Sequence, residues 1–322
     1  MDETERIERR LKLHDLRVLM SVVDEGSMAK AAERLATSQP AVSRTIADLE
    51  HSLSVRLLDR GPRGVVPTPY GRALIKRSVT VFDELRQGVK DLEFLADPTA
   101  GEVRIAAPMI MAAGLVPAVI DRLTRRHPRV VCHLTVDMTY RALEEREVDL
   151  VITQIGLGAA DHMEVEAELL YADRLFVVAA TKNPWSRRRR ISLADLMNEP
   201  WTLPPPDMPG MVHAEVFRAA GLGLPAATVV IASGIARIAL VAEGRFLTLA
   251  AESVFRFASR NMAIKALPID VPDIRIPVGI VTLKNRTLTP VAQLFIDCAR
   301  EIARPMAKGK TVSARRRQVR DG

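Results

Sequence analysis

The sequence is poor in the residues that build disulfides, redox centres and metal sites. Its 322 residues include only two cysteines, Cys132 and Cys298, which lie far apart and outside any CxxC or Cys/His spacing. Buried free thiols are therefore favoured, with a redox pair as the alternative. The six histidines are scattered, and none has the spacing of a zinc ligand set. The sequence predicts neither a metal nor a cofactor.

Long apolar runs and enzyme motifs are also missing. No stretch is apolar for long enough to span a bilayer, and residues 1–12 are dense in both charges where a signal peptide would be apolar. We therefore expect a cytoplasmic protein that makes no use of a membrane. There is no GxSxG, no P-loop, no GxGxxG after a strand and no HExxH. The sequence predicts no enzyme and no catalytic residue, and Asp149 is interpreted as a structural turn residue.

The net charge of +7 is concentrated in particular segments. The tail from Arg304 to Gly322 has seven basic residues and one acidic residue, so the rest of the chain is nearly neutral. This tail is interpreted as disordered, with nonspecific DNA affinity as the alternative. The run from Arg187 to Arg190 is typical of a solvated loop, and contact with DNA or a partner is its alternative. Only the segment from Arg34 to Arg77, with eight basic and three acidic residues, combines an excess of positive charge with a recognisable pattern of secondary structure.

That segment lies among short predicted helices. Apolar residues from Leu13 to Val23 recur at helical spacing, Gly26 can end the helix, and Ser27 can cap the next one. A third helix begins near Ser38. Its inward face carries Val42, Ile46 and Leu49, and its opposite face carries Gln39, Pro40, Ser43 and Arg44. A helix that reads the major groove needs such a small, donor-bearing outer face, although an ordinary amphipathic helix with a solvated face shares the pattern.

Two short β-like runs follow the third helix. They flank a Gly/Pro turn that bears Arg60 and Arg63, which predicts a basic hairpin beside the helix. Such a hairpin is typical of a DNA-binding wing.

At this point the sequence resembles the LysR-type transcriptional regulators. The resemblance rests on Gly26 to Leu35 (GSMAKAAERL), Ser38 to Arg44 (SQPAVSR), Leu57 to Arg60 (LLDR) and Thr68 to Gly71 (TPYG). Leu58 stands where the family usually has Phe. The resemblance implies a DNA-binding dimer or tetramer that controls transcription, with RNA polymerase as a candidate partner. Its implied contacts to bases and phosphates are Ser27, Ser38, Gln39, Pro40, Ser43, Arg44, Arg60 and Arg63.

One long helix is predicted over residues 71–97. Its residues Ile75, Ser78, Phe82, Leu85, Val89, Leu92 and Ala96 form a heptad seam. A dimerisation helix is favoured over a helix packed on its own domain. The predicted boundaries are a winged helix-turn-helix domain at 1–70, this linker helix at 71–97, an effector domain at 98–305 and a basic tail at 306–322.

The effector domain alternates apolar β-type runs with helical stretches. This pattern predicts parallel-rich sheets covered by helices, with ligands beyond the carboxyl ends of the strands. The overall fold class is therefore α+β with two domains. The family resemblance implies a periplasmic-binding-protein-like α/β domain, with subdomain I at 101–170 and 273–305 and subdomain II at 171–272. Its implied cleft residues are Met109, Ile110, Met111, Thr139, Thr153, Gln154, Pro204, Pro205 and Ser233, with core packing an equal alternative for the three from Met109 to Met111.

The polar cleft candidates carry hydroxyl and amide groups but no charge. They favour a neutral hydroxylated effector, such as a sugar, over a dicarboxylate, although a cleft arginine could hold an anion. The stretch from Gly244 to Ala250 and the one from Phe94 to Pro98 resemble the family's sugar-responsive regulators of galactose-binding protein genes. A transport component and a DNA-binding protein that needs no ligand are the rival functions. The helix-turn-helix pattern argues against the first.

Overall fold

The computed structural model describes residues 11–61, 64–137, 140–155, 164–208, 212–258 and 262–307. The chain divides into two units, residues 1–88 and residues 89–322, and each is described by itself. Among the described residues, no helix is both long enough and apolar enough to cross a membrane.

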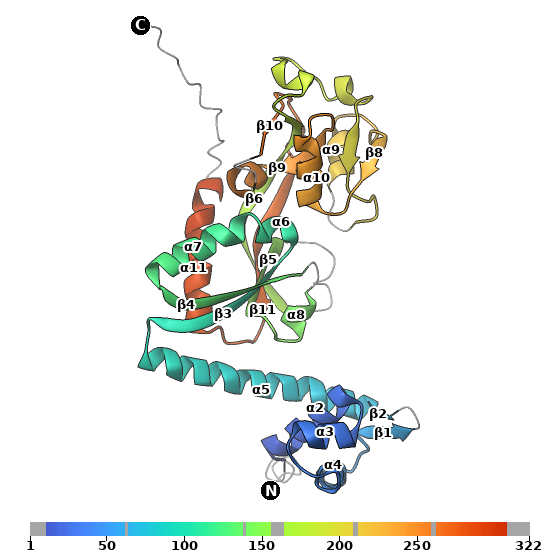
Figure 1. Ribbon diagram of the computed structural model, residues 1–322, viewed down its shortest axis with the longest axis vertical. Coiled ribbons are helices and arrows are strands. Elements are labelled where there is room, and N and C mark those ends of the chain that lie inside the picture. Colours follow the sequence, from blue (N-terminus) through green and yellow to red (C-terminus); the bar gives the residue numbers. More distant parts are fainter. Residues whose placement is uncertain are drawn as a thin grey trace. The chain divides into compact units, whose positions relative to one another are not determined.

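The described part of the first unit comprises three short helices, a hairpin and the start of a long helix (Figure 1). The helices are α2 (Leu13–Glu25), α3 (Met28–Arg34) and α4 (Gln39–Leu53). Gly26 ends α2 with a left-handed φ of 61°, and the Ser27 and Ser38 hydroxyls cap α3 and α4 by accepting backbone N–H groups. Apolar side chains from all three helices form one core. The inward face predicted for α4, with Val42, Ile46 and Leu49, is buried in it, whereas Leu13 at the start of α2 is exposed.

The hairpin is tied to this core at two points. Strands β1 (Leu58–Gly61) and β2 (Gly64–Pro67) pair in antiparallel register. The Glu50 carboxylate on α4 accepts the backbone N–H groups of Leu57 and Leu58, at 2.7 and 3.1 Å. The Val65 N–H donates to the Gly26 carbonyl at 2.9 Å. The hairpin is therefore fixed against both α4 and the turn that begins α3.

The second unit contains two subdomains. Subdomain I holds β3 (Ala100–Ala107), β4 (Arg129–Val136), β5 (Leu150–Gln154) and β11 (Arg275–Leu283), with the helices α6 (Met109–Ala112), α7 (Leu115–Arg126), α8 (Arg141–Glu144) and α11 (Pro290–Ala307). Subdomain II holds β7 (Trp201–Leu203), β8 (Ala227–Val230), β9 (Thr248–Ala251) and β10 (Ile264–Ala266), with α9 (His213–Ala219) and α10 (Gly234–Ala242). The helix α5 (Pro69–Ala96) precedes β3 and contributes residues to both units.

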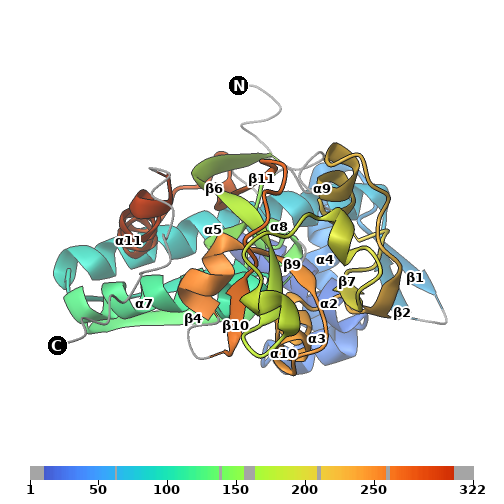
Figure 2. The ribbon, with the colours of Figure 1, turned by 90° about the horizontal axis from the view of Figure 1, so that it is seen from above.

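One long strand, β6 (Val165–Ala180), serves both subdomains. Its first part, to Arg174, pairs with β11, and its last part pairs with β9 and β10. Figure 2 shows β6 and β11 running side by side. The expectation of parallel-rich sheets is wrong for these strands. Although β3 is parallel to β4 and β5, β11 is antiparallel to both β5 and β6. The reason is that β6 leaves subdomain I and β11 returns to it, so the two run in opposite directions.

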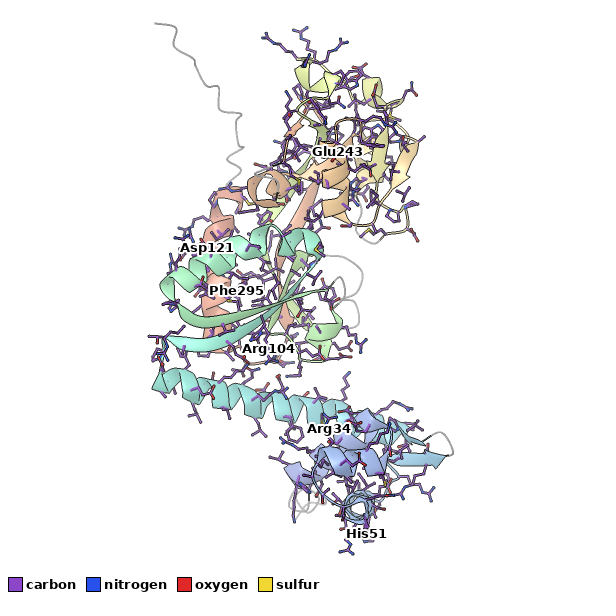
Figure 3. The ribbon with its side chains drawn as sticks, viewed as in Figure 1. Arg34, His51, Arg104, Asp121, Glu243 and Phe295 are labelled. Atoms are coloured by element: carbon purple, nitrogen blue, oxygen red, sulfur yellow. The ribbon has the colours of Figure 1, made fainter. Side chains whose placement is uncertain are left out.

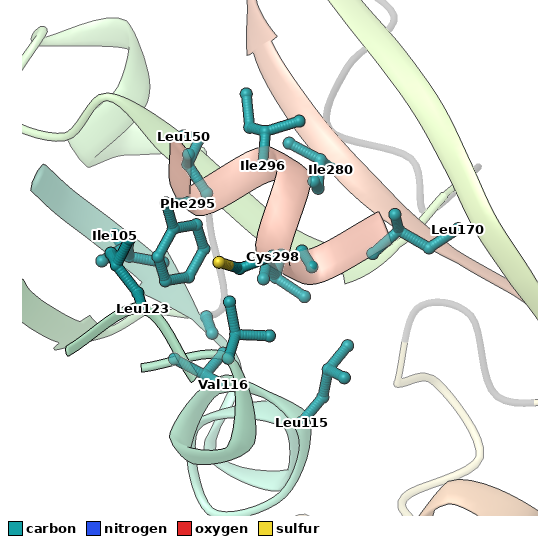
Figure 4. Packing of buried hydrophobic residues seen from close by; sticks show 14 of the residues in the cluster. Ile105, Leu115, Val116, Leu123, Leu150, Leu170, Ile280, Phe295, Ile296 and Cys298 are labelled. Carbon is teal, nitrogen blue, oxygen red and sulfur yellow. The ribbon is translucent and has the colours of Figure 1, made fainter. Parts of the chain in front are cut away.

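Subdomain I is held by a large apolar core between its sheet and the helices α7 and α11. Phe295 and Cys298 of α11 pack against Leu115, Val116 and Leu123 of α7 and against strand residues such as Ile105 (Figure 4). Subdomain II has a separate core around Trp201 and Phe217, whose rings meet edge to face at 5.3 Å. The unit therefore has two separate apolar cores, one in each subdomain, and the strand β6 runs from one subdomain into the other.

Candidate functional site

The first two turns of α4 present the residues expected to meet DNA. Gln39, Pro40 and Arg44 are exposed and Ser43 is half-buried, while Val42, Ile46 and Leu49 on the opposite side are buried in the core. Ser38 caps the helix through its hydroxyl. Exposed donors therefore gather at the positive end of a helix whose other face is anchored, which is the arrangement that major-groove reading needs.

Two further DNA-contact candidates, Ser27 and Arg60, lie next to the hairpin and on it. Ser27 begins α3, and the bond from Val65 to Gly26 brings β2 next to this turn. Gly64 has a φ of +112°, and a Cβ there would lie 2.6 Å from the Gly26 carbonyl oxygen, so the close approach requires glycine. Arg60 is exposed on β1. Arg63 lies outside the described residues.

The predicted seam on α5 changes character along the helix. Ile75 packs against the core of the first unit, and Phe82 lies under the Arg17 guanidinium at 5.2 Å. Leu85, Val89 and Leu92 are exposed, by 48%, 55% and 67%. Three large apolar side chains at heptad spacing are thus exposed in the described chain. The role of α5 as a dimerisation helix stays a prediction, and these three side chains are the surface that it would use.

In subdomain I, the cleft candidates follow strands that run in the same direction. Met109, Ile110 and Met111 form α6 just after β3, and Thr153 and Gln154 end β5. Since β3 and β5 are parallel, both groups lie at one edge of the sheet. Met111 is buried in the core, as is Thr153 in the sheet, whereas Met109 is exposed. Thr139 lies outside the described residues.

In subdomain II, the candidates also follow parallel strands. Pro204 and Pro205 follow β7, and Ser233 follows β8 as the N-cap of α10. Ser233 is exposed, and its hydroxyl accepts the Ala236 N–H at 3.3 Å. The capping role means that this oxygen is already used by the fold.

The two edges meet through α6 and α10, which are in contact. Ile110 packs against the core of subdomain I and also against the cluster of Ile238 and Val241 on α10. A Cβ at Gly234 would lie 3.7 Å from Ile110 Cδ1. The structure therefore brings Ile110 and Ser233 to one place, and their roles in ligand binding stay a prediction.

Arg237 is a residue of this region that the sequence reasoning missed. It lies on the apolar face of α10 with Ile238 and Val241, and it is 7% exposed. Its Nη1 donates to the Ile231 carbonyl at 2.7 Å and to the Ala232 carbonyl at 3.2 Å. The signal was available, because an arginine at helical spacing among apolar residues is rarely buried without a partner.

Asp149, the one acidic residue weighed as a general base, has a structural environment. Its Oδ2 accepts the Arg104 backbone N–H at 2.8 Å, and its Oδ1 lies 3.3 Å from Arg286 Nη2. Both side chains of the ion pair are almost fully buried. Asp149 thus links β3 to the start of β5, as its interpretation as a turn residue predicts. Among the described residues, no group of three or more His, Cys, Asp or Glu side chains could hold a metal ion.

A second buried carboxylate lies where β6 passes from one subdomain to the other. Asp173 is 2% exposed, and its Oδ1 accepts the Ser253 N–H at 3.2 Å. Its Oδ2 has no hydrogen-bond partner among the described residues. Burial raises the pKa of Asp173 to about 6, with Glu252 adding to the effect and the bonds from Ser253 opposing it. Folding therefore favours the protonated form of Asp173, although the carboxyl is still mostly ionised above about pH 6.

We expect Asp173→Asn to be more stable than the wild type at pH 7.5 and equally stable at pH 4. The raised pKa stabilises the folded state below about pH 4, and this contribution is lost as pH rises through about 6. Two pKa units correspond to at most about 3 kcal/mol. Urea unfolding at several pH values measures the difference, with Asp270→Asn as an exposed control. A difference that is the same at pH 4 and pH 7.5 would show that ionisation of Asp173 plays no part.

The two cysteines remain free thiols in the structure. Cys298 is buried in the core of subdomain I, and Cys132 on β4 is half-buried beside the same core. Burial raises the pKa of both thiols, so both are held in the unreactive form. A shallow polar depression lies elsewhere, lined by residues of β6 and β11, by the residue after α9 and by the segment before β11: Arg174, Ala220, Asp270, Val271, Pro272, Asp273 and Arg275.

Comparison with known families gives two matches that together cover most of the chain. The model described as "Bacterial regulatory helix-turn-helix protein, lysR family" matches residues 13–72. The model described as "LysR substrate binding domain" matches residues 96–304. The first match covers α2 to the start of α5, and the second covers both subdomains.

Individual relatives extend over nearly the same length. The transcriptional regulator GbpR of Azospirillum brasilense is 30% identical over 91% of this chain and 87% of its own. An SDS degradation transcriptional activation protein of a Pseudomonas species is 31% identical over 87% of this chain and 93% of its own. Among solved structures, full-length OxyR from Pseudomonas aeruginosa has a TM-score of 0.63 at 22% identity, covering 92% of this chain and 97% of its own. Full-length CbnR complexed with its target DNA has a TM-score of 0.53 at 22% identity, covering 91% and 100%. At such identities the structures show a shared fold.

Proposed function

Because the chain belongs to the LysR family of bacterial transcription regulators, we propose that the N-terminal half of α4 reads the major groove of an operator. The observation that carries the proposal is the exposure of Gln39, Pro40 and Arg44 on a helix whose other face is buried in the core. Ser27, Ser38 and Ser43 border this surface, and Arg60 supplies a cation for phosphate from the hairpin. A role on chromosomal DNA in a bacterium implies the cytoplasm.

The second unit is a regulator's substrate-binding domain, and a small-molecule effector would act through the edge where α6 meets α10. A ligand that contacts both subdomains favours one arrangement of them over another, and its effect equals its difference in affinity for the two arrangements. Two observations support this place. The cleft candidates of both subdomains follow parallel strands, and Ile110 packs against both the core of subdomain I and the cluster of Ile238 and Val241 on α10. Such regulators act as dimers or larger assemblies, for which the exposed seam on α5 is the proposed surface.

Arg44→Ala tests the DNA-reading half of the proposal. We expect specific operator binding to weaken by about 1–3 kcal/mol, because a side chain that donates to a base edge is lost. The fold should be unaffected, since Arg44 is exposed. A gel-shift titration of the full chain on operator DNA measures the change, and His51→Ala serves as the control, because His51 is an exposed residue at the far end of the same helix (Figure 3). Equal affinity of Arg44→Ala and wild type would remove Arg44 from the interface.

A further inference from the structure

The Arg237 guanidinium is charged, buried and incompletely bonded. More than nine-tenths of the residue is hidden from solvent. Its Nη1 is used by the Ile231 and Ala232 carbonyls, but Nε is buried without any hydrogen-bond partner, and Nη2 makes no hydrogen bond to any described residue. Nε and Nη2 form one side of the planar group, which is the side that binds a carboxylate through two parallel hydrogen bonds. That side is unused within the described chain.

No acidic side chain of the described residues pairs with Arg237. The charge also lies in the first turn of α10, a nine-residue helix, where the helix dipole is positive and disfavours a cation. Buried His213 lies near enough for Arg237 to add to the burial that lowers the pKa of His213 to about 4. Buried charges in proteins are ordinarily paired, because an unpaired one costs several kcal/mol. The arrangement is therefore electrostatically incomplete.

The unused side of Arg237 lies at the meeting of the two subdomains. A Cβ at Gly234 would be 3.7 Å from Arg237 Nη2 and also 3.7 Å from Ile110 Cδ1. The guanidinium and the Ile110 side chain therefore approach the same point from opposite subdomains. Ile110 offers an apolar surface there, and α6 carries the exposed Met109 beside it.

We infer that this point is a binding site for an organic carboxylate, with the carboxylate on the Nε and Nη2 side of Arg237 and the apolar body of the ligand against Ile110. The inference rests on the proposed effector control and names the class of effector. One guanidinium matches one carboxylate in charge and geometry. A ligand held by α10 and α6 together contacts both subdomains, as an effector must to alter their arrangement.

The neutral, sugar-like effector favoured by the sequence has less support at this point. That expectation relied on hydroxyl and amide groups, yet the Ser233 hydroxyl caps α10 and Thr153 is buried in the sheet. Gln154 is half-buried and can still donate. A neutral ligand would leave the Arg237 charge unpaired, whereas a carboxylate would neutralise it.

The test uses the full chain, with thermal shift and isothermal titration as the measurements. The probes are hexanoate, benzoate and succinate as carboxylates, inorganic phosphate as another anion, and galactose as the neutral compound, all at constant ionic strength. We expect a carboxylate to stabilise the wild type, and we expect Arg237→Gln to weaken its binding by roughly tenfold to a hundredfold. Arg237→Lys should weaken it as well, because an ammonium cannot form the two parallel bonds. Arg245→Gln, an exposed arginine just beyond α10, should bind as the wild type does.

Gly234→Asp provides a variant that should fold even if Arg237 variants do not. Aspartate at the first position of a helix is favourable, and the space at Gly234 accepts a Cβ at ordinary contact distance. Its carboxylate would lie within reach of Arg237, so we expect it to abolish carboxylate binding, while Gly234→Ala retains it. The readout is again the titration.

The outcomes separate this inference from the proposed function. Equal carboxylate binding by wild type and Arg237→Gln, binding of phosphate or galactose only, or no carboxylate binding by the wild type overturns the inference. If galactose alone binds and alters operator affinity, effector control stands and the carboxylate assignment fails. If operator affinity is indifferent to every compound, the proposed effector control fails with it, and the chain acts as a ligand-independent regulator.

Discussion

Arg286→Met is expected to destabilise the folded chain by about 3–5 kcal/mol. The Arg286 side chain is 3% exposed, lies 3.3 Å from Asp149 Oδ1 through Nη2, and donates from Nη1 to the Val148 carbonyl at 2.5 Å. Removing the guanidinium leaves a carboxylate buried without its counter-charge, and this costs far more than the ion pair itself contributes. The loss falls on the junction of β3 and β5 in the sheet of subdomain I. Urea unfolding of the wild type and the variant measures it.

A second substitution, at Asp149, separates the effect of the unpaired charge from the effect of lost side-chain packing at Arg286. Asp149→Asn removes the orphaned charge while its side-chain oxygen can still accept the Arg104 N–H. The double variant Asp149→Asn, Arg286→Met should therefore recover a substantial part of the loss. A single-variant loss below about 1 kcal/mol would place this pair in the range of surface ion pairs, and the account of Asp149 as a structural linker would fail.

Leu85→Lys with Val89→Lys is expected to separate the assembly into single chains. Both side chains are about half-exposed in one chain, so two lysines there should not disturb its fold. In a dimer sealed by the seam, the same lysines would be buried without partners. A dimer would carry four such lysines, two from each chain, so if each costs about 2 kcal/mol or more, the dissociation constant rises by roughly a millionfold. Light scattering and sedimentation at micromolar concentration report the mass.

The control for this pair carries the same added lysines off the seam. Thr80→Lys with Asp91→Lys lies on the same helix, at heptad positions away from Leu85 and Val89. It should keep the wild-type mass. If the Leu85 and Val89 variant also keeps it, the exposed stripe on α5 has another role, and the dimer surface must be sought on other elements.

The helices of the DNA-binding unit could be predicted because their signals are local. Ser27 and Ser38 accept the N–H groups that their places in the sequence suggest, and Gly26 has the left-handed φ that ends α2. The inward face of α4 follows from spacing alone, since helix geometry puts residues three and four apart on one side. The opposite side of α4 must then face outwards, so the DNA-contact candidates on α4 follow from the same spacing.

The first half of β6 could not be predicted in this way. Only Leu175 to Ala180 has the apolar pattern of a buried strand, whereas Glu166, Glu168 and Asp173 interrupt the part before it. Those residues form a strand because β11 pairs with them along its whole length, and that contact joins positions about a hundred residues apart. The same non-local pairing overturned the expectation of a mainly parallel sheet.

Arg237 shows a different limit. Its position on the apolar face of α10 could be predicted from helical spacing. Which groups surround its guanidinium could not be predicted, because they come from other parts of the chain. The carbonyls of Ile231 and Ala232 turn towards it only because β8 ends at Val230, and Ile110 comes from the other subdomain. The site is assembled by the tertiary fold, so a list of polar residues near strand ends omitted its one buried charge.

We propose that this chain, a transcription regulator, reads specific DNA sites through α4 under the control of a small molecule. Genomic footprinting of the full chain tests it most directly, with wild type and Arg44→Ala side by side and with each repeated in the presence of the carboxylates. We predict discrete protected sites, each with two half-sites about 10 base pairs apart or a multiple of that spacing. We also predict that the protection changes with a carboxylate and requires a higher protein concentration in Arg44→Ala. Diffuse, salt-sensitive protection that is identical in both proteins and unchanged by every carboxylate would contradict the account.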